Sequence, residues 1–150
     1  MNIICIKYKR TIKETISEEG VNRTITPISD NLSKLNVDKI ESTTDGVHFQ
    51  NSFFNGQGRY HLMAPVDEGW ITINPQRKML IYKISITRMI LLLCGICSFF
   101  ILLTVNLPRW MPITLISFLL GGNILITVIR HSFFANKIKK QVLEILTRNN

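Results

Sequence analysis

The clearest pattern in the chain is a pair of almost purely apolar segments at residues 89–105 and 113–129. A bilayer core of roughly 30 Å needs about 17–25 helical residues, and each segment reaches that length before its flanks are added. The pattern therefore predicts a two-helix transmembrane hairpin over residues 86–131, with spans at about 89–107 and 111–130. Neither apolar segment contains a charged side chain, as expected of helices that face lipid.

Two prolines set the turn of this predicted hairpin. Pro108 and Pro112 cannot continue a helix without losing a backbone hydrogen bond, so the turn is expected near Arg109. An antiparallel arrangement about this point brings the small residues of both helices to the same depth, where close packing stabilises membrane helices. The predicted packing contact comprises Cys94, Gly95, Ser98, Gly121, Gly122 and Asn123.

Asn123 is the strongest hydrogen-bonding side chain in either predicted span. An amide inside a membrane can hold a substrate or an ion, but no intramembrane charge accompanies it to form an ion pathway. We therefore expect a structural, interhelical hydrogen bond to Ser98 or to a nearby carbonyl. Contact between Asn123 and a second copy of the protein is the remaining alternative.

Residues 1–85 predict a small antiparallel β-meander with little helix. Alternating apolar and polar positions predict a strand within residues 1–10 and two hairpins, within residues 39–54 and 70–84. A further short strand is expected at residues 60–63.

The first predicted hairpin carries a turn signal at Asp45-Gly46. This pair favours a type I′ turn, in which both central residues adopt positive φ. Since successive side chains of a strand point to opposite faces, Val47 and Phe49 are expected to face the core.

Two further helices are expected outside the apolar segments. Pro27 argues against a continuous helix through residues 11–28, so the first is confined to about residues 29–36. The second is an amphipathic helix at residues 132–150 that either lies on lipid or covers the open face of the sheet, and we expect the sheet. Its apolar stripe consists of Phe134, Ile138, Val142 and Ile145. The predicted fold class is thus an α+β membrane protein.

The net charge of +8 is explained by topology better than by nucleic acid, which is not an expected partner. Basic side chains cluster on both sides of the apolar region, while the loop between the segments carries only Arg109. The positive-inside rule then places both termini in the cytoplasm. Tyr82 and Trp110 are expected as the inner and outer aromatic anchors. The residues expected at the membrane surface are Arg77, Lys78, Lys83, Arg88, Arg130, Lys137, Lys139 and Lys140.

No chemical motif in the chain predicts catalysis. Cys94 and Cys97 have redox spacing, but a lipid-facing segment supplies neither the water nor the cation that activates a thiol. His48, His61 and Asp67 are the best candidates for a metal site, without any established ligand pattern. We therefore expect no cofactor, no bound metal and no enzymatic activity.

The function expected from these features is a small integral membrane adaptor or accessory subunit. Its β domain would bind another protein at the bilayer, so the expected partners are the lipid bilayer and either a protein partner or a second copy of the chain. The first alternative is a homo-oligomeric channel or pore. The second is a membrane-bound, metal-dependent enzyme built on the histidines.

Overall fold

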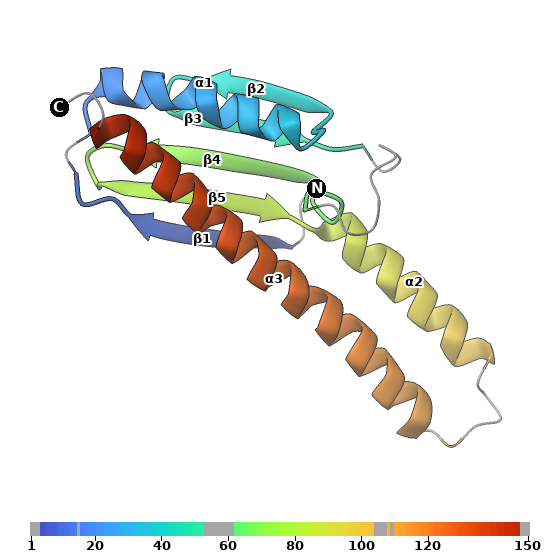
Figure 1. Cartoon of the computed structure of the whole chain (residues 1–150). Helices are drawn as coiled ribbons and strands as arrows, with labels where there is room; N and C mark the ends of the chain where they lie inside the picture. The colour runs from blue at the N-terminus through green and yellow to red at the C-terminus, as the bar shows by residue number, and fades with distance from the viewer. Residues whose placement is uncertain (1–3, 15, 53–61, 104–107, 109, 148–150) are drawn as a thin grey trace.

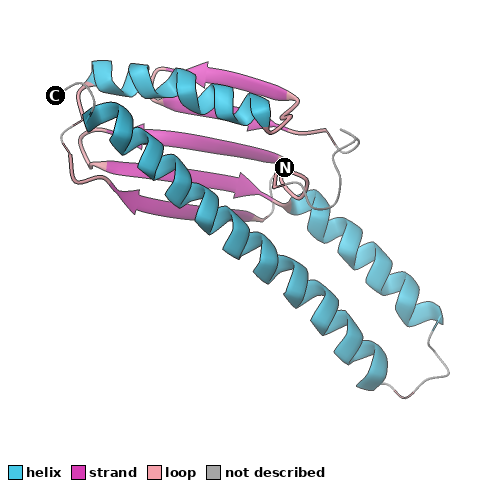
Figure 2. Ribbon diagram, in the orientation of Figure 1, coloured by secondary structure: helices cyan, strands magenta, loops and turns pink. Residues whose placement is uncertain are grey.

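The computed structural model of the chain describes residues 4–14, 16–52, 62–103, 108 and 110–147 (Figure 1). These residues form one antiparallel sheet of five strands and three helices (Figure 2). The elements in chain order are β1 (Cys5–Thr11), α1 (Glu18–Lys34), β2 (Lys39–Thr43), β3 (Gly46–Gln50), β4 (Glu68–Asn74), β5 (Met79–Ser85), α2 (Thr87–Leu103) and α3 (Trp110–Thr147).

The strand order in the sheet is β1-β5-β4-β3-β2, with antiparallel pairing throughout. The predicted antiparallel sheet is confirmed, but it is not a simple meander, because β1 pairs with the last strand instead of the next one. Val47 and Phe49 are buried as predicted. The predicted strand at residues 60–63 is not supported: residues 62 and 63 form a turn, and the rest lies outside the described residues.

The turn between β2 and β3 lies one residue earlier than predicted. Gly46 is the first residue of β3 and pairs with Thr43, so the loop consists of Thr44 and Asp45. Asp45 does not adopt positive φ. Gly46 is needed for another reason: a Cβ on it would come within 2.0 Å of the backbone oxygen of Ile71.

Helix α1 corrects the prediction of a short helix after Pro27, because it runs through that proline. A proline within a helix costs about 3 kcal/mol. Four apolar side chains on one face offset this cost, since each contributes roughly 1.5–3 kcal/mol when it is buried. These residues are Val21, Ile25, Ile28 and Leu32. The helix ends as expected near Asn36, which adopts a left-handed φ of 50°.

The second half of α3 covers the inner face of the sheet beside α1 (Figure 1). Ile138 and Val142 are 2% and 0% exposed within the same core as the strands. The prediction that the C-terminal amphipathic segment packs on the sheet is therefore confirmed. The segment is not a separate helix, since α3 continues from the apolar half without interruption.

The predicted two-helix transmembrane hairpin is wrong. Among the described residues, α3 is the one helix that is long and apolar enough to cross a membrane. Helix α2 has 17 residues, the lower limit for a membrane span, and not all of them extend beyond the sheet domain. The first turn of α2 belongs partly to the sheet domain, because Thr87 is buried and Met89 packs against the core.

Candidate functional site

The apolar half of α3 and helix α2 extend away from the sheet domain (Figure 1). Only 6% of the most apolar stretch of α3 is buried, so this stretch is not the core helix of the domain. Exposed apolar surface of this extent marks a protein or membrane contact. On the apolar half of α3, residues 110–129, the exposed large apolar side chains are Trp110, Met111, Ile113, Leu115, Phe118, Leu125, Ile126 and Ile129.

The small residues predicted to pack the two helices together are not brought into contact. A Cβ added to Gly95, Gly121 or Gly122 would meet no atom within 4 Å. Ser98 Oγ donates to the Cys94 carbonyl at 2.9 Å, within the same helix.

Asn123 likewise bonds within its own helix, its Nδ2 donating to the Leu119 carbonyl at 2.7 Å. This bond lies within one helix, whereas the predicted hydrogen bond joins two helices. Helix α2 and α3 instead meet closer to the domain, where Thr127 Oγ1 lies 3.8 Å from Met89 Sδ.

The basic residues predicted at the membrane surface lie in two places. Arg88 and Arg130 stand where the apolar extension meets the sheet domain. Arg77 and Lys78 lie in the turn between β4 and β5, at the opposite end of the sheet. Lys83 is on the outer sheet face, and Lys137, Lys139 and Lys140 follow along the domain half of α3. The cytoplasmic placement of both termini rests on the charge pattern alone and stays a prediction.

The two aromatic residues predicted as membrane anchors, Tyr82 and Trp110, lie in different environments. Tyr82 is fully buried in the core, so its expected place at the inner interface is wrong. Trp110 is 64% exposed at the start of α3, and its expected place at the outer interface stays a prediction.

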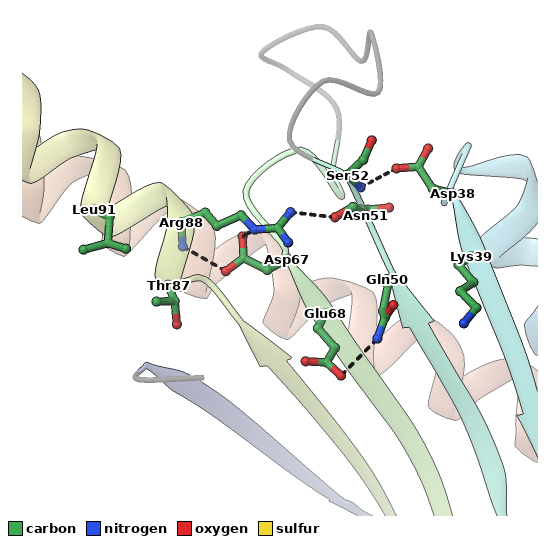
Figure 3. A pocket seen from close by; sticks show the side chains of 10 residues that line it. All are labelled: Asp38, Lys39, Gln50, Asn51, Ser52, Asp67, Glu68, Thr87, Arg88 and Leu91. Carbon is green, nitrogen blue, oxygen red and sulfur yellow. Dashed lines mark hydrogen bonds and ion pairs between the residues drawn. The ribbon is translucent and has the colours of Figure 1, made fainter. Parts of the chain in front are cut away.

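A polar cavity of about 540 Å³ lies where the sheet joins α2 (Figure 3). Strands β2, β3 and β4 and the first turn of α2 all contribute to its wall. Its charged lining residues are Asp38, Lys39, Asp67, Glu68 and Arg88.

Two of these five charges, Asp67 and Arg88, hold the joint between sheet and helix. Asp67 Oδ2 accepts the backbone N–H of Arg88 at 2.9 Å, at the positive N-terminal end of α2. Arg88 Nη1 donates to the Asn51 carbonyl at 3.0 Å. Asn51 is itself fixed, because its Nδ2 donates to the carbonyls of Met63 and Val66. The cavity therefore marks a rigid joint more than an open chemical site.

The outer face of the sheet is not covered by any described helix, since α1 and α3 both pack on the inner face (Figures 1 and 2). One row of side chains crosses all five strands on this face. The paired positions are Glu41, His48, Trp70, Lys83 and Lys7.

Trp70 is held in the middle of this row. The Lys83 Nζ lies 4.8 Å from the centre of the Trp70 ring, and the His48 ring stacks on it at 5.1 Å. His48 Nε2 in turn lies 2.7 Å from Glu68 Oε1. A hydrogen bond from Lys39, followed by one from His48, lowers the pKa of Glu41. Glu41 and Glu68 on this face are therefore already engaged, Glu41 by Lys39 and Glu68 by the His48 ring.

The metal site considered from the sequence is not supported. Within the described residues, no group of three His, Cys, Asp or Glu side chains could hold a metal ion. His48 is paired with two glutamates on the outer face, whereas Asp67 caps α2. His61 lies outside the described residues.

The Trp70–Lys83 contact was missed from the sequence, although a signal for it was present. The final hairpin was predicted with residues 75–78 as its connection, and that connection is the observed one. Pairing residues outward from this loop places Trp70 opposite Lys83. A cation opposite an aromatic ring at such a position favours a cation–π contact.

Comparison with known proteins gave no relatives. A scan of protein-family models, a search of characterised proteins and a search of solved structures each returned no match.

Proposed function

We propose that this chain is a non-enzymatic, membrane-anchored adaptor or accessory subunit. The observation that supports it best is the division of α3 into an exposed apolar half and a half buried in the sheet domain. The apolar half, residues 110–129, inserts into lipid, and the same helix holds the domain at the bilayer surface. About 20 helical residues match the roughly 30 Å of a bilayer core.

Flotation with vesicles tests the membrane anchor. The full chain should float with phosphatidylcholine vesicles and resist extraction at high salt, because its contact with the bilayer is apolar. Replacement of Phe118 and Leu125 by Asp should move the protein out of the vesicle fraction, since each charge in the bilayer centre costs about 3 kcal/mol.

The matched control adds the same charge to the sheet domain, as Ser33→Asp with Ser42→Asp, at two exposed positions. This variant should float like the unchanged protein. An unchanged protein that stays monomeric and out of the vesicle fraction would contradict the anchor.

The adaptor role is carried by the outer sheet face. A partly buried Trp held between a cation and a ring is the kind of rigid aromatic anchor on which protein interfaces depend. Lys7, Lys9 and Lys83 add positive charge at the β1 side of this face. We propose that it binds an acidic surface of another protein in the same membrane.

Site-specific photo-crosslinking in native membranes tests this face. A crosslinker at Thr72, beside Trp70, should give an adduct with a different protein that disappears on Trp70→Ala. The same crosslinker at Ser33 on α1 should give none. An adduct of twice the mass of the chain would show that this face binds a second copy of the chain instead of a different protein. The absence of any adduct would contradict both the adaptor role and self-association through this face.

A further inference from the structure

A groove of about 460 Å³ lies between α1 and the middle of α3. Three of its lining side chains are basic and none is acidic: Lys34 comes from α1, and Arg130 and Lys137 come from α3. The remaining lining includes Leu35, Leu62 and Phe133. The groove thus combines a cluster of positive charge with an apolar wall.

The position of the groove along α3 suggests its ligand. Arg130 directly follows Ile129, the last exposed apolar residue of the proposed anchor. Phe133 is 70% exposed and lies one turn further on. Along α3 the surface therefore changes from apolar to basic within about one helical turn, roughly 5 Å.

A hydrogen bond joins the two helices that form the groove. Asn31 Nδ2 donates to Gln141 Oε1 at 3.1 Å, and also to the Pro27 carbonyl at 3.0 Å. This bond links α1 to α3 at the groove, so Lys34 and Lys137 are carried by two helices fixed against each other. The cluster is not a run of charges on one flexible segment.

We infer that this groove binds the headgroup of an anionic phospholipid. The inference rests on the proposed membrane anchor, because the lipid chains would lie along residues 113–129 while the phosphate reaches Arg130. The three cations attract the single negative charge of the phosphate, and Phe133 contacts the upper part of the chains. A free phosphate ion would use only the cations, so it should bind much more weakly than the lipid.

Thermal unfolding of the full chain in neutral detergent tests this site. Short-chain phosphatidylglycerol should raise the unfolding temperature, whereas short-chain phosphatidylcholine and inorganic phosphate at the same concentration should not. Replacement of Lys34, Arg130 and Lys137 by Gln should raise the phosphatidylglycerol concentration needed for the shift by about 100-fold, given the contribution of each cation near anionic lipid.

Two further variants separate a built site from general charge. Lys13, Arg77 and Lys78 replaced by Gln remove the same charge from exposed positions outside the groove, and this variant should respond like the unchanged protein. Lys34→Arg with Lys137→Arg keeps the charge and should also keep the response.

Equal loss in the groove variant and in the control variant would overturn the specific site. An equal rise in the unfolding temperature with inorganic phosphate would mean that the groove binds a free anion and not a lipid. Flotation with phosphatidylcholine vesicles reports the anchor separately, because no anionic lipid is present there. A groove variant that still floats but no longer responds to phosphatidylglycerol is the expected result.

Discussion

At the scale of single residues, Tyr82 and His131 form the polar centre of an otherwise apolar core. The hydroxyl of Tyr82 lies 2.7 Å from Nδ1 of His131, and both residues are 0% exposed. Burial raises the pKa of Tyr82 well above its usual value, so the phenol stays protonated and donates to the ring. Burial lowers the pKa of His131 to about 4; the Leu62 backbone opposes this shift and Arg130 adds to it.

This shift predicts a loss of stability in mild acid. The unfolded chain has an ordinary histidine pKa of 6.5, against about 4 in the fold. Between these values the unfolded state binds the proton more readily, so stability is full above pH 6.5 and falls as the pH falls. The loss attributable to His131 between pH 7 and pH 5 should be about 2 kcal/mol.

This loss is measured by chemical unfolding in neutral detergent at pH 7 and at pH 5, with near-ultraviolet circular dichroism as the signal. The free energies of unfolding at the two pH values are then compared. His131→Asn should flatten the pH dependence, even if the variant is less stable overall. Tyr82→Phe keeps the imidazole buried and should retain the dependence. An unchanged slope in His131→Asn would contradict the assignment.

Residue-scale prediction succeeded where strand alternation was followed strictly. Val47 and Phe49 were placed correctly by that rule, and the same rule puts Leu80, Tyr82 and Ile84 on the buried face. Tyr82 was misplaced because its closeness to the apolar segment was given more weight than its position in the strand.

At the scale of elements, α3 joins the apolar segment proposed as the anchor to the domain without a break. Its 38 residues contain no proline after Pro112, which lies in the first turn where proline is tolerated. The domain half contributes Phe134, Ala135, Ile138 and Val142 to the core. Its apolar stripe could be predicted, whereas its continuity with the anchor could not, since Ser132 is compatible with either a bend or a straight helix.

The domain half of α3 should therefore control the stability of the sheet. Ile138→Ala removes a fully buried side chain and should cost about 3 kcal/mol of unfolding free energy. Lys140→Ala, at an exposed position of the same helix, should change it by less than about 0.5 kcal/mol. Urea unfolding in neutral detergent compares the two, and equal stability would mean that the helix does not cover the sheet in solution.

Helix α1 shows what local rules miss. The rule that proline interrupts helices is sound for an isolated segment, but in this fold four buried apolar side chains outweigh its cost. The spacing of Val21, Ile25, Ile28 and Leu32 was available in the sequence and follows the helical period. In this fold, the helical spacing of the four apolar residues determines the structure of the segment, and the single proline does not.

At the scale of the whole molecule, the α+β class and the antiparallel sheet followed from the sequence. The pairing of β1 with β5 did not, because the partner of an edge strand depends on contacts between residues far apart in the chain. The basic groove could not be predicted for the same reason: Lys34 and Lys137 come together only when α1 and α3 pack side by side. Arg130 and Lys137 alone were identified, as general surface charges.

The placement of α3 after the five described strands also determines the order in which these elements are made. All five strands leave the ribosome before α3 does, so the inner face of the sheet has no complete cover while they emerge. The apolar half of α3 is synthesised next, and the residues that close the core, Val142 among them, come after it. The domain therefore completes its folding only after the apolar half of α3, the proposed anchor, has been made, and a chain whose synthesis stops before α3 is finished exposes an apolar sheet to the chaperones and proteases of the cell.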